Sequence, residues 1–285
     1  DLVAPPRPAD TPRVQRQAPA EADDRKSIAV LPFVNMSGDV ENEYFSDGIS
    51  EEILNLLVKL PELRVASRTS SFIFKGKEVS IPQVASELRV DAVLEGSIRR
   101  AGDRVRITAQ LIDAASDSHL WSETYDREMK DVFAIQDDIA QSITDALQIT
   151  LSPKERRAIQ NVATSDARAY DFYLRGRSYM YTMTQRDYEH AIGMFNEAID
   201  QDAKYALAYA GIADAYSHMF RYADASHENA EKAREASEKA IALDPDSAEA
   251  RASRGLAMFI SEDYPEAELE FEKAIELNPN LFESY

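Results

Sequence analysis

The sequence contains no cysteine. This absence excludes disulfides, zinc–thiolate sites and thiol chemistry together. Long apolar runs are also missing, since none approaches the ~18 residues that a membrane-spanning helix requires. No charged-then-apolar leader follows Asp1, so we expect neither a signal peptide nor a membrane span in this stretch, and we expect any anchor to lie upstream of it.

Basic residues are the second deficit. The chain has 51 Asp and Glu residues against 32 Lys and Arg residues, which gives a formal charge of −19. The excess is concentrated in residues 166–285, where 24 acids face 12 bases. Such a surface repels a phosphate backbone, so no nucleic-acid binding is expected from this chain. Solubility is the simplest role of the charge.

Groups that could converge on a catalytic centre are scarce as well. The four histidines are scattered, without the i, i+4 spacing of a helical metal site, and are expected to be exposed or partly packed: His119, His190, His218 and His227. The acidic pairs Glu51–Glu52 and Asp137–Asp138 are neighbours that point about 100° apart on a helix, so we expect solvated faces there. We predict no catalytic residue, no metal site and no cofactor.

The strongest pattern in the chain is a repeat with a spacing of 34 residues. The phrase "EKAIALDPDSAEA" returns as "EKAIELNPNLFES". Equivalent positions are Ala233 and Ala267, Ser237 and Phe271, Ala240 and Ala274, and Pro245 and Pro279. This period is typical of tetratricopeptide (TPR) repeats, in which each unit is a pair of antiparallel helices. Small residues let the helices approach closely, and the proline ends each unit.

Earlier copies of the same pattern precede these two. One has its small and aromatic positions at Tyr188, Ala191, Phe195 and Ala198. A middle repeat starts near Tyr209 and contains an insertion around "HMFRYADASHEN". A fourth begins at "LFESY", where the sequence stops, so we expect a fragment of a longer protein whose last helix pair exposes an apolar edge.

The region before the repeats predicts an α/β domain. Ile28 to Phe33 is a nearly continuous apolar run, typical of a strand buried on both faces. An amphipathic helix is expected over 43–60, with Gly48 inside it as a sign of close packing against a neighbour. A strand "LRVAS" and a short helix "IPQVASEL" follow. The phrases "DAVLEGSIRR", "DRVRITAQLID" and "HLWSETYDRE" then predict three strands, and "DVFAIQDDIAQSITDALQITL" predicts a final helix.

These elements give four regions. We predict a Pro/Ala-rich disordered linker over 1–26, a mixed-sheet α/β domain over 27–150, a helical connector over 151–165 and an all-α TPR superhelix over 166–285.

Five phrases, in this order, resemble the TolB-like N-terminal domain of bacterial multidomain regulators: "SIAVLPFVNMSGDVENEYFSDGISEEI", "RVASRTSSFIFKGK", "VLEGSIRRAGDRVRITAQLIDA", "HLWSETYDRE" and "VFAIQDDIA". In that family TPR repeats follow, as they do here. The preceding part is a CadC-like winged-helix domain with a membrane helix, a class III adenylate cyclase, or a membrane-linked protein kinase. The resemblance implies a non-catalytic accessory or sensory role. It favours a periplasmic location, with a cytoplasmic one as the alternative.

Two functions stay open at this point. The first is a protein-interaction and sensory module that regulates an upstream output domain. The second is a small-molecule sensor, in which the α/β domain captures a ligand at the ends of its buried strands and controls an adenylate cyclase, kinase or DNA-binding domain.

For the first function, the expected partner-binding surface is the concave side of the superhelix. Aligning the first helix of each repeat places these residues there: Tyr170, Tyr173, Arg177 and Met180; Leu207, Ala210, Asp214, Ser217 and His218; Glu249, Ala252, Leu256, Phe259 and Ile260. A clamp for a C-terminal carboxylate needs several Lys, Arg and Asn residues, and this surface offers only Arg177. The groove instead suits an amphipathic helix or an extended peptide of neutral or basic character.

Overall fold

The computed structural model describes residues 25–153, 155–156 and 163–281. Its first half is a mixed sheet in the order β3-β1-β4-β5-β6, with β2 paired to β4. The strands are β1 Lys26–Val30, β2 Val34–Asn35, β3 Leu63–Val65, β4 Ala92–Ala101, β5 Arg104–Asp113 and β6 Ser118–Glu128. β1 is parallel to β3 and β4, whereas β4, β5 and β6 are antiparallel. The predicted mixed sheet is confirmed, and residues 1–24 of the expected linker lie outside the described residues.

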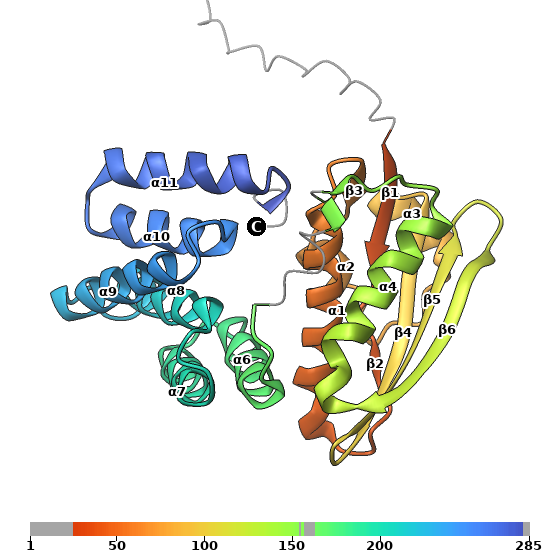
Figure 1. Ribbon diagram of the computed structural model, residues 1–285, viewed down its shortest axis with the longest axis horizontal. Coiled ribbons are helices and arrows are strands. Elements are labelled where there is room, and N and C mark those ends of the chain that lie inside the picture. Colours follow the sequence, from red (N-terminus) through yellow and green to blue (C-terminus); the bar gives the residue numbers. More distant parts are fainter. Residues whose placement is uncertain (1–24, 154, 157–162, 282–285) are drawn as a thin grey trace, which may run out of the picture.

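β1 is central because helices cover both faces of the sheet around it. Ile28 and Val30 belong to the large core on one face, and Ala29 belongs to a smaller core on the other. The large core is covered by α1 Glu43–Val58 and α4 Val132–Ala146, and the smaller one by α3 Ile81–Leu88 (Figure 1). The short helix α2 Arg68–Phe72 is joined to α1 through the ion pair of Arg68 with Glu51. Short 3-10 turns at 40–42 and 129–131 precede α1 and α4.

The three antiparallel strands have one solvent-exposed face, as the alternation of apolar and polar residues predicts. On β5, Val105, Ile107, Ala109 and Leu111 are at most 1% exposed, while Arg104 and Arg106 are exposed. Trp121 and Tyr125 of β6 pack against the core on the buried side. Core packing therefore accounts for these two aromatic residues.

The second half is a stack of helix pairs that resembles TPR repeats (Figure 1). Its helices are α6 Ala167–Met180, α7 Gln185–Gln201, α8 Ala206–Tyr222, α9 His227–Leu243, α10 Ala248–Ile260 and α11 Tyr264–Leu277. The small residues of the repeat pattern are buried as predicted: Ala191, Ala198, Ala233, Ala240, Ala267 and Ala274 are at most 3% exposed. Only close helix packing leaves so little room.

Aromatic side chains fill the space that glycines leave between helices. Phe195 of α7 lies against Gly176 of α6 and Gly211 of α8, and a Cβ atom at either glycine would come within 2.5 Å of its ring. The ring is fully buried. One phenylalanine thus fixes the spacing of three helices.

Differences between the repeats appear at their ends. The insertion of the middle repeat lengthens α8 to 17 residues, against 13 in α10. On α11, Leu269, Ile275 and Leu277 are each more than 40% exposed, so this helix presents apolar side chains to solvent. The last four residues, 282–285, lie outside the described residues.

The two halves share one hydrophobic core. A single cluster of buried residues runs from the sheet through α1 and α4 to α6, α7 and α8, and reaches Ala236 of α9. Figure 1 shows α6 lying next to α1, and these two helices contact each other directly. The repeats are therefore joined to the α/β domain by packing as well as by the connector.

Candidate functional site

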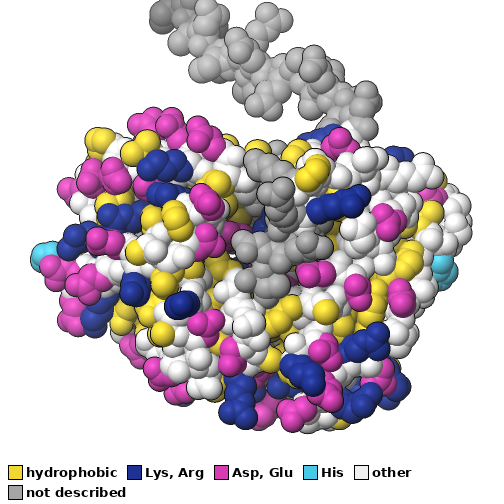
Figure 2. All heavy atoms as spheres, viewed as in Figure 1, with side chains coloured by type: hydrophobic (Ala, Val, Ile, Leu, Met, Phe, Trp, Pro, Cys, Tyr) yellow, Lys and Arg dark blue, Asp and Glu magenta, His cyan; other side chains and the backbone are white. Residues whose placement is uncertain are grey.

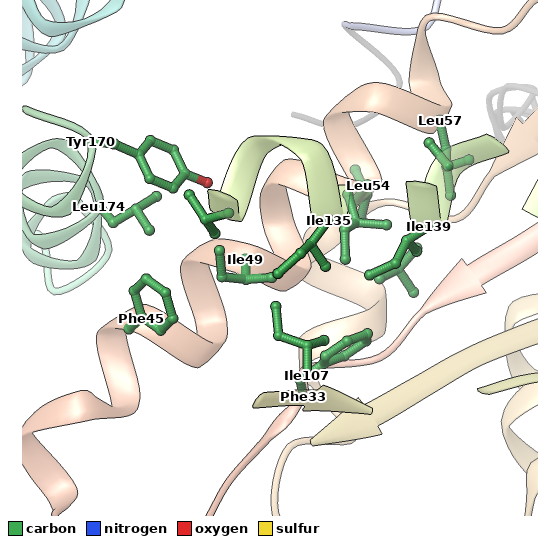
Figure 3. Packing of buried hydrophobic residues seen from close by; sticks show 14 of the residues in the cluster. Phe33, Phe45, Ile49, Leu54, Leu57, Ile107, Ile135, Ile139, Tyr170 and Leu174 are labelled. Atoms are coloured by element: carbon green, nitrogen blue, oxygen red, sulfur yellow. The ribbon is translucent and has the colours of Figure 1, made fainter. Parts of the chain in front are cut away.

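The contact between α1 and α6 covers the inner side of the first repeat. Tyr170, Tyr173 and Leu174 of α6 are at most 3% exposed. Figure 3 shows Tyr170 and Leu174 pointing toward the helix that carries Phe45 and Ile49. The Tyr170 hydroxyl accepts a hydrogen bond of 2.7 Å from Nε2 of Gln136 on α4, which satisfies its polar group inside the core.

Gly48 permits this close approach. A Cβ atom at Gly48 would lie 2.8 Å from Cδ2 of Leu174. The glycine costs helix stability locally, but it lets the leucine of the repeats sit directly on the α1 backbone. The sequence predicted a close neighbour at Gly48, and that neighbour belongs to the other domain.

A buried carboxylate fixes one end of the contact. Glu51 of α1 is 5% exposed, and it accepts hydrogen bonds from Arg68 at 3.0 Å and from both Arg177 and Tyr181 of the first repeat. The Arg68 guanidinium also stacks on the Tyr181 ring at 3.4 Å. Burial alone would raise the pKa of Glu51, but the charges of Arg177 and Arg68 lower it below its ordinary value. The expectation of a solvated Glu51 is wrong, because α6 covers this face of α1.

A second polar cluster lies at the other end of the contact between α1 and α6. Asp171 of α6 accepts a hydrogen bond of 2.7 Å from the Tyr44 hydroxyl and forms ion pairs with Arg100 of β4 and Arg175 of α6. Arg100 also donates to the Tyr44 oxygen at 3.0 Å. Each cluster carries groups from both domains, so the two clusters fix the register of α6 on α1.

Beside this contact lies a cavity of about 390 Å³. Its walls come from α1 and α4 on one side, and from α6, the start of α8, the α9–α10 turn and the end of α11 on the other. Residues 152, 155, 163 and 164 of the connector complete it. Asn280, just beyond α11, donates a hydrogen bond of 2.9 Å to the Val58 carbonyl and so ties the last described turn to α1. This cavity between the domains is the candidate site.

Carboxylates outnumber bases on the cavity walls. Among the described residues of these walls, the acids are Glu52, Asp137, Glu155, Asp244, Asp246, Glu249 and Glu276, and the bases are Lys59 and Arg177. Burial, followed by the charge of Glu51, raises the pKa of Glu52 to about 7. Burial, followed by the charge of Asp138, raises the pKa of Asp137 to about 6. Burial is the first cause of both shifts and a neighbouring carboxylate the second, so the charged form of each acid is disfavoured in the folded chain.

Aromatic rings form the apolar part of the same walls. Phe133 and Tyr170 lie with ring centroids 4.8 Å apart, and Tyr173 and Tyr205 lie 5.1 Å apart. All four line the cavity. The walls therefore combine carboxylates with aromatic residues whose tyrosine side chains are at most 3% exposed.

The structure brings five of the predicted partner-binding residues to this cavity: Tyr170, Tyr173, Arg177, Leu207 and Glu249. Tyr170 and Tyr173 are covered by the α/β domain, and Arg177 is engaged by Glu51. These three side chains thus contact α1 and α4, and they are not freely open to a partner in the groove. The sequence pattern gave no sign that α1 and α4 cover this side of α6.

The other nine predicted residues are not among those that line the cavity: Met180, Ala210, Asp214, Ser217, His218, Ala252, Leu256, Phe259 and Ile260. Burial raises the pKa of Asp214 to about 6. His218 lies between the rings of Tyr188 and Tyr222, its Nδ1 has no hydrogen-bond partner among the described residues, and burial lowers its pKa. Phe259 is 47% exposed. The partner-binding role of the whole set stays a prediction.

The sequence reading missed the contribution of the α/β domain to the site. Glu52, Asn55 and Asp137 line the cavity from α1 and α4. Gly48 was the one available signal, since a glycine inside an amphipathic helix suggests a close neighbour.

Neither a metal centre nor a membrane span is found where the structure can be read. Over residues 25–153, 155–156 and 163–281, no group of His, Asp and Glu side chains could hold a metal ion. The helices of the same ranges are all too short or too polar to cross a bilayer.

A protein-family model matches the first half of the chain. Residues 24–146 match the family described as "HilA/YgeH-like transcriptional regulator, second domain". This range coincides with the α/β domain and covers less than half of the chain.

One similar curated protein is "Putative adenylate cyclase 3" of Rhizobium meliloti (strain 1021). It is 40% identical over 206 residues, which are 72% of this chain and 35% of that protein. The chain thus matches about a third of the length of this relative.

Solved structures resemble parts of this chain. The second TPR of Spaghetti (RPAP3), bound to the HSP90 peptide SRMEEVD, is 28% identical and covers 39% of this chain and 92% of its own, with a TM-score of 0.32. TolB from Acinetobacter baumannii is 16% identical and covers 44% of this chain and 29% of its own, also with a TM-score of 0.32. At these TM-scores neither likeness bears on function.

Proposed function

We propose that this chain is a non-catalytic interaction and sensory module of a larger bacterial signalling protein, and that its repeats bind a protein or peptide partner. The observation that carries this proposal is the uncovered inner side of α10. Leu256 and Phe259 are partly or largely exposed there, while the equivalent side of α6 is buried against α1. An apolar side chain held in the open at a concave position favours a binding role.

The chemistry of the open surface defines the partner. Leu256 and Phe259 supply apolar contacts, and Asp214 and Glu249 supply negative charge. The surface suits an amphipathic helix or an extended peptide of neutral or basic character. A C-terminal carboxylate is a poor candidate, because Arg177, the one predicted cation of the groove, is held by Glu51.

The shared core connects the proposed partner-binding helices to the α/β domain. A partner on α8 and α10 contacts helices that pack through Phe195 and Tyr205 onto α6, and α6 is fixed to α1. Partner binding and the state of the α/β domain are therefore coupled in free energy if the partner favours one arrangement of the repeats. The cyclase-named relative and the regulator family support an output domain, a cyclase or a DNA-binding domain, elsewhere in the longer protein.

The test compares two double variants of the chain. Leu256→Ala with Phe259→Ala removes the proposed contacts, and Leu269→Ala with Ile275→Ala removes exposed apolar side chains from α11, outside the predicted concave set. Both are screened on an array of basic amphipathic peptides. We expect the first pair to weaken binding about tenfold or more with an unchanged melting temperature, and the second pair to bind normally. Equal binding by both pairs contradicts the proposal.

Location is part of the same proposal. A membrane-linked arrangement places these domains in the periplasm, whereas a soluble cyclase arrangement, which the cyclase-named relative favours, keeps them in the cytoplasm. A reporter active only in the cytoplasm, fused after Tyr285 of the full-length protein, distinguishes the two. Strong reporter activity excludes the periplasmic location.

A small-molecule sensor is the second candidate function. The cavity between the domains supports it, because cavities of this size at domain interfaces commonly hold ligands. It differs from the sequence-based hypothesis in place, since its walls are α1, α4 and the repeats, and not the carboxyl ends of the buried strands.

A further inference from the structure

The turns that follow α7, α9 and α11 share one backbone geometry. Each begins with an extended residue, at φ −137°, −139° and −144°: Asp202, Asp244 and Asn278. In each turn the side-chain oxygen of this residue accepts a hydrogen bond from the backbone N–H two positions later, at 2.9, 3.2 and 3.2 Å. The residues that donate these bonds therefore hold equivalent places in the three turns: Lys204, Asp246 and Asn280.

The third of these equivalent residues has a different environment. Lys204 and Asp246 are exposed, whereas Asn280 is only 9% exposed. Nδ2 of Asn280 donates its hydrogen bond of 2.9 Å to the carbonyl of Val58, the last residue of α1. The last carbonyls of a helix have no partner within that helix. Asn280 thus caps α1 from the far end of the repeats.

The repeats contact α1 at two separate places. Figure 1 shows them leaving α1 at α6 and returning toward it at the end of α11. α6 lies against α1 through buried side chains such as Leu174 and through the clusters around Glu51 and Asp171. The second contact is the hydrogen bond of Asn280 to Val58, and the next residue, Leu281, is 5% exposed.

These two contacts differ in strength. Buried apolar side chains and charged pairs stabilise the contact of α6 with α1. The contact at Val58 includes a hydrogen bond between two neutral groups, whose net contribution is small because water offers both groups similar bonds. The contact at Val58 is therefore the one that opens first.

We infer that the turn at 278–281 is a latch, which holds the far end of the repeats on α1. When Asn280 releases Val58, the repeats move as a body about the contact between α1 and α6. Pro61, Pro279 and Leu281 line the cavity between the domains, so release of the latch widens the cavity on this side. A molecule that binds the open and the closed arrangement with different affinity shifts the balance between them. The latch belongs to the chain itself and does not depend on a peptide partner.

The test measures the distance between the two halves of the 285-residue chain by double electron–electron resonance. Because the chain has no cysteine, Glu62→Cys and Glu272→Cys place single spin labels after α1 and on α11, both at exposed positions. Asn280→Asp removes the amide donor and brings a carboxylate to the Val58 carbonyl, yet it fits the turn, since Asp246 holds the equivalent place. We expect one main distance in the parent, and a second, longer distance whose population rises about tenfold in Asn280→Asp.

Two further variants serve as controls for charge and for the lost donor. Asn196→Asp adds the same charge at an exposed position of α7 and should keep the distance of the parent. Asp and Glu side chains are already spread over the repeats (Figure 2), so one more changes the surface charge little. Asn280→Ala removes the donor without adding charge, and should show the longer distance at a smaller population than Asn280→Asp.

Hydrogen exchange of α6 completes the test, because a pivot at α6 requires its amides to stay protected in the Asn280 variants. An unchanged distance in both Asn280 variants, or an equal longer population in Asn196→Asp, overturns the latch. Loss of protection in α6 would show that the two halves separate completely, which overturns the movement about α6.

Discussion

α6 and α10 are the first helices of the first and third repeats, and they carry the same concave positions. On α6 these positions hold Tyr170, Tyr173 and Arg177, which are buried or paired against α1. On α10 they hold Glu249, Leu256 and Phe259, which remain partly or largely open. One repeat pattern therefore serves two purposes: α6 is an internal joint between domains, and α10 is a surface. The repeat fixes where a side chain points, but the neighbour determines what the side chain does.

The largest difference in stability between α6 and α10 is expected when one aromatic residue on each of these helices is truncated. Tyr173→Ala should lower the free energy of unfolding by about 3–5 kcal/mol, because it leaves a cavity in the shared core. Phe259→Ala should change it by less than about 1 kcal/mol, since nearly half of that side chain is already in water. Urea unfolding of the two variants gives both values. Similar losses would show that α10 is as buried as α6.

The next largest effect on the free energy of unfolding is expected from neutralising Glu51, the buried carboxylate that joins α6 to α1. Glu51→Gln leaves Arg68 and Arg177 facing each other without their shared carboxylate, and should cost about 2–4 kcal/mol. Glu249→Gln, its matched control on α10, should be within about 0.5 kcal/mol of the parent. Chemical denaturation near pH 7 measures both. If Glu51→Gln leaves the free energy of unfolding unchanged, the cluster around Glu51 does not hold α6 to α1.

The third prediction concerns pH. Glu52 has a pKa raised to about 7 in the folded chain, with Glu51, Lys59, Arg177 and Glu249 as the charged groups around it. A folded pKa above the unfolded value means that ionisation of Glu52 destabilises the fold, so its cost grows as pH rises from about 4 to 7 and stays constant above that.

Glu52→Gln should therefore stabilise the chain by on the order of 1–2 kcal/mol at pH 8 and have little effect at pH 4.5. Thermal melts across this range test the sign. An effect that is largest at low pH would contradict the raised pKa.

The smallest expected effect concerns two helical glycines. Gly48→Ala places a methyl group 2.8 Å from Leu174 and should cost about 1 kcal/mol, although the leucine end can shift. Gly193→Ala on α7 meets no atom within 4 Å and should stabilise by about 0.5–1 kcal/mol through helix propensity. Opposite signs in the two variants confirm that Gly48 is kept for the contact with the repeats.

Much of the fold could be predicted because it follows from local patterns. The apolar run at Ile28, the alternation on β5 and the 34-residue spacing of Ala233 and Ala267 each fixed an element that the structure contains. The inner side of the repeats could be assigned for the same reason, since the helical period determines which residues share a face. What covers that side on α6 could not be predicted, because it is α1, which lies more than 100 positions away in the chain.

The sequence by itself determined the elements, their order, the small-residue packing of the repeats and the acidity of the chain. Only the tertiary structure decided that α6 rests on α1, that Glu51 is buried, and that Glu52, Asp137 and Glu249 meet around one cavity. The physical reason is the range of the interactions. Hydrophobic periodicity and helix packing within a repeat act between near neighbours in sequence. The contact of α1 with α6 and the cavity depend on distant pairs such as Gly48 and Leu174, and the local pattern at Gly48 indicates a close neighbour without saying which residue it is.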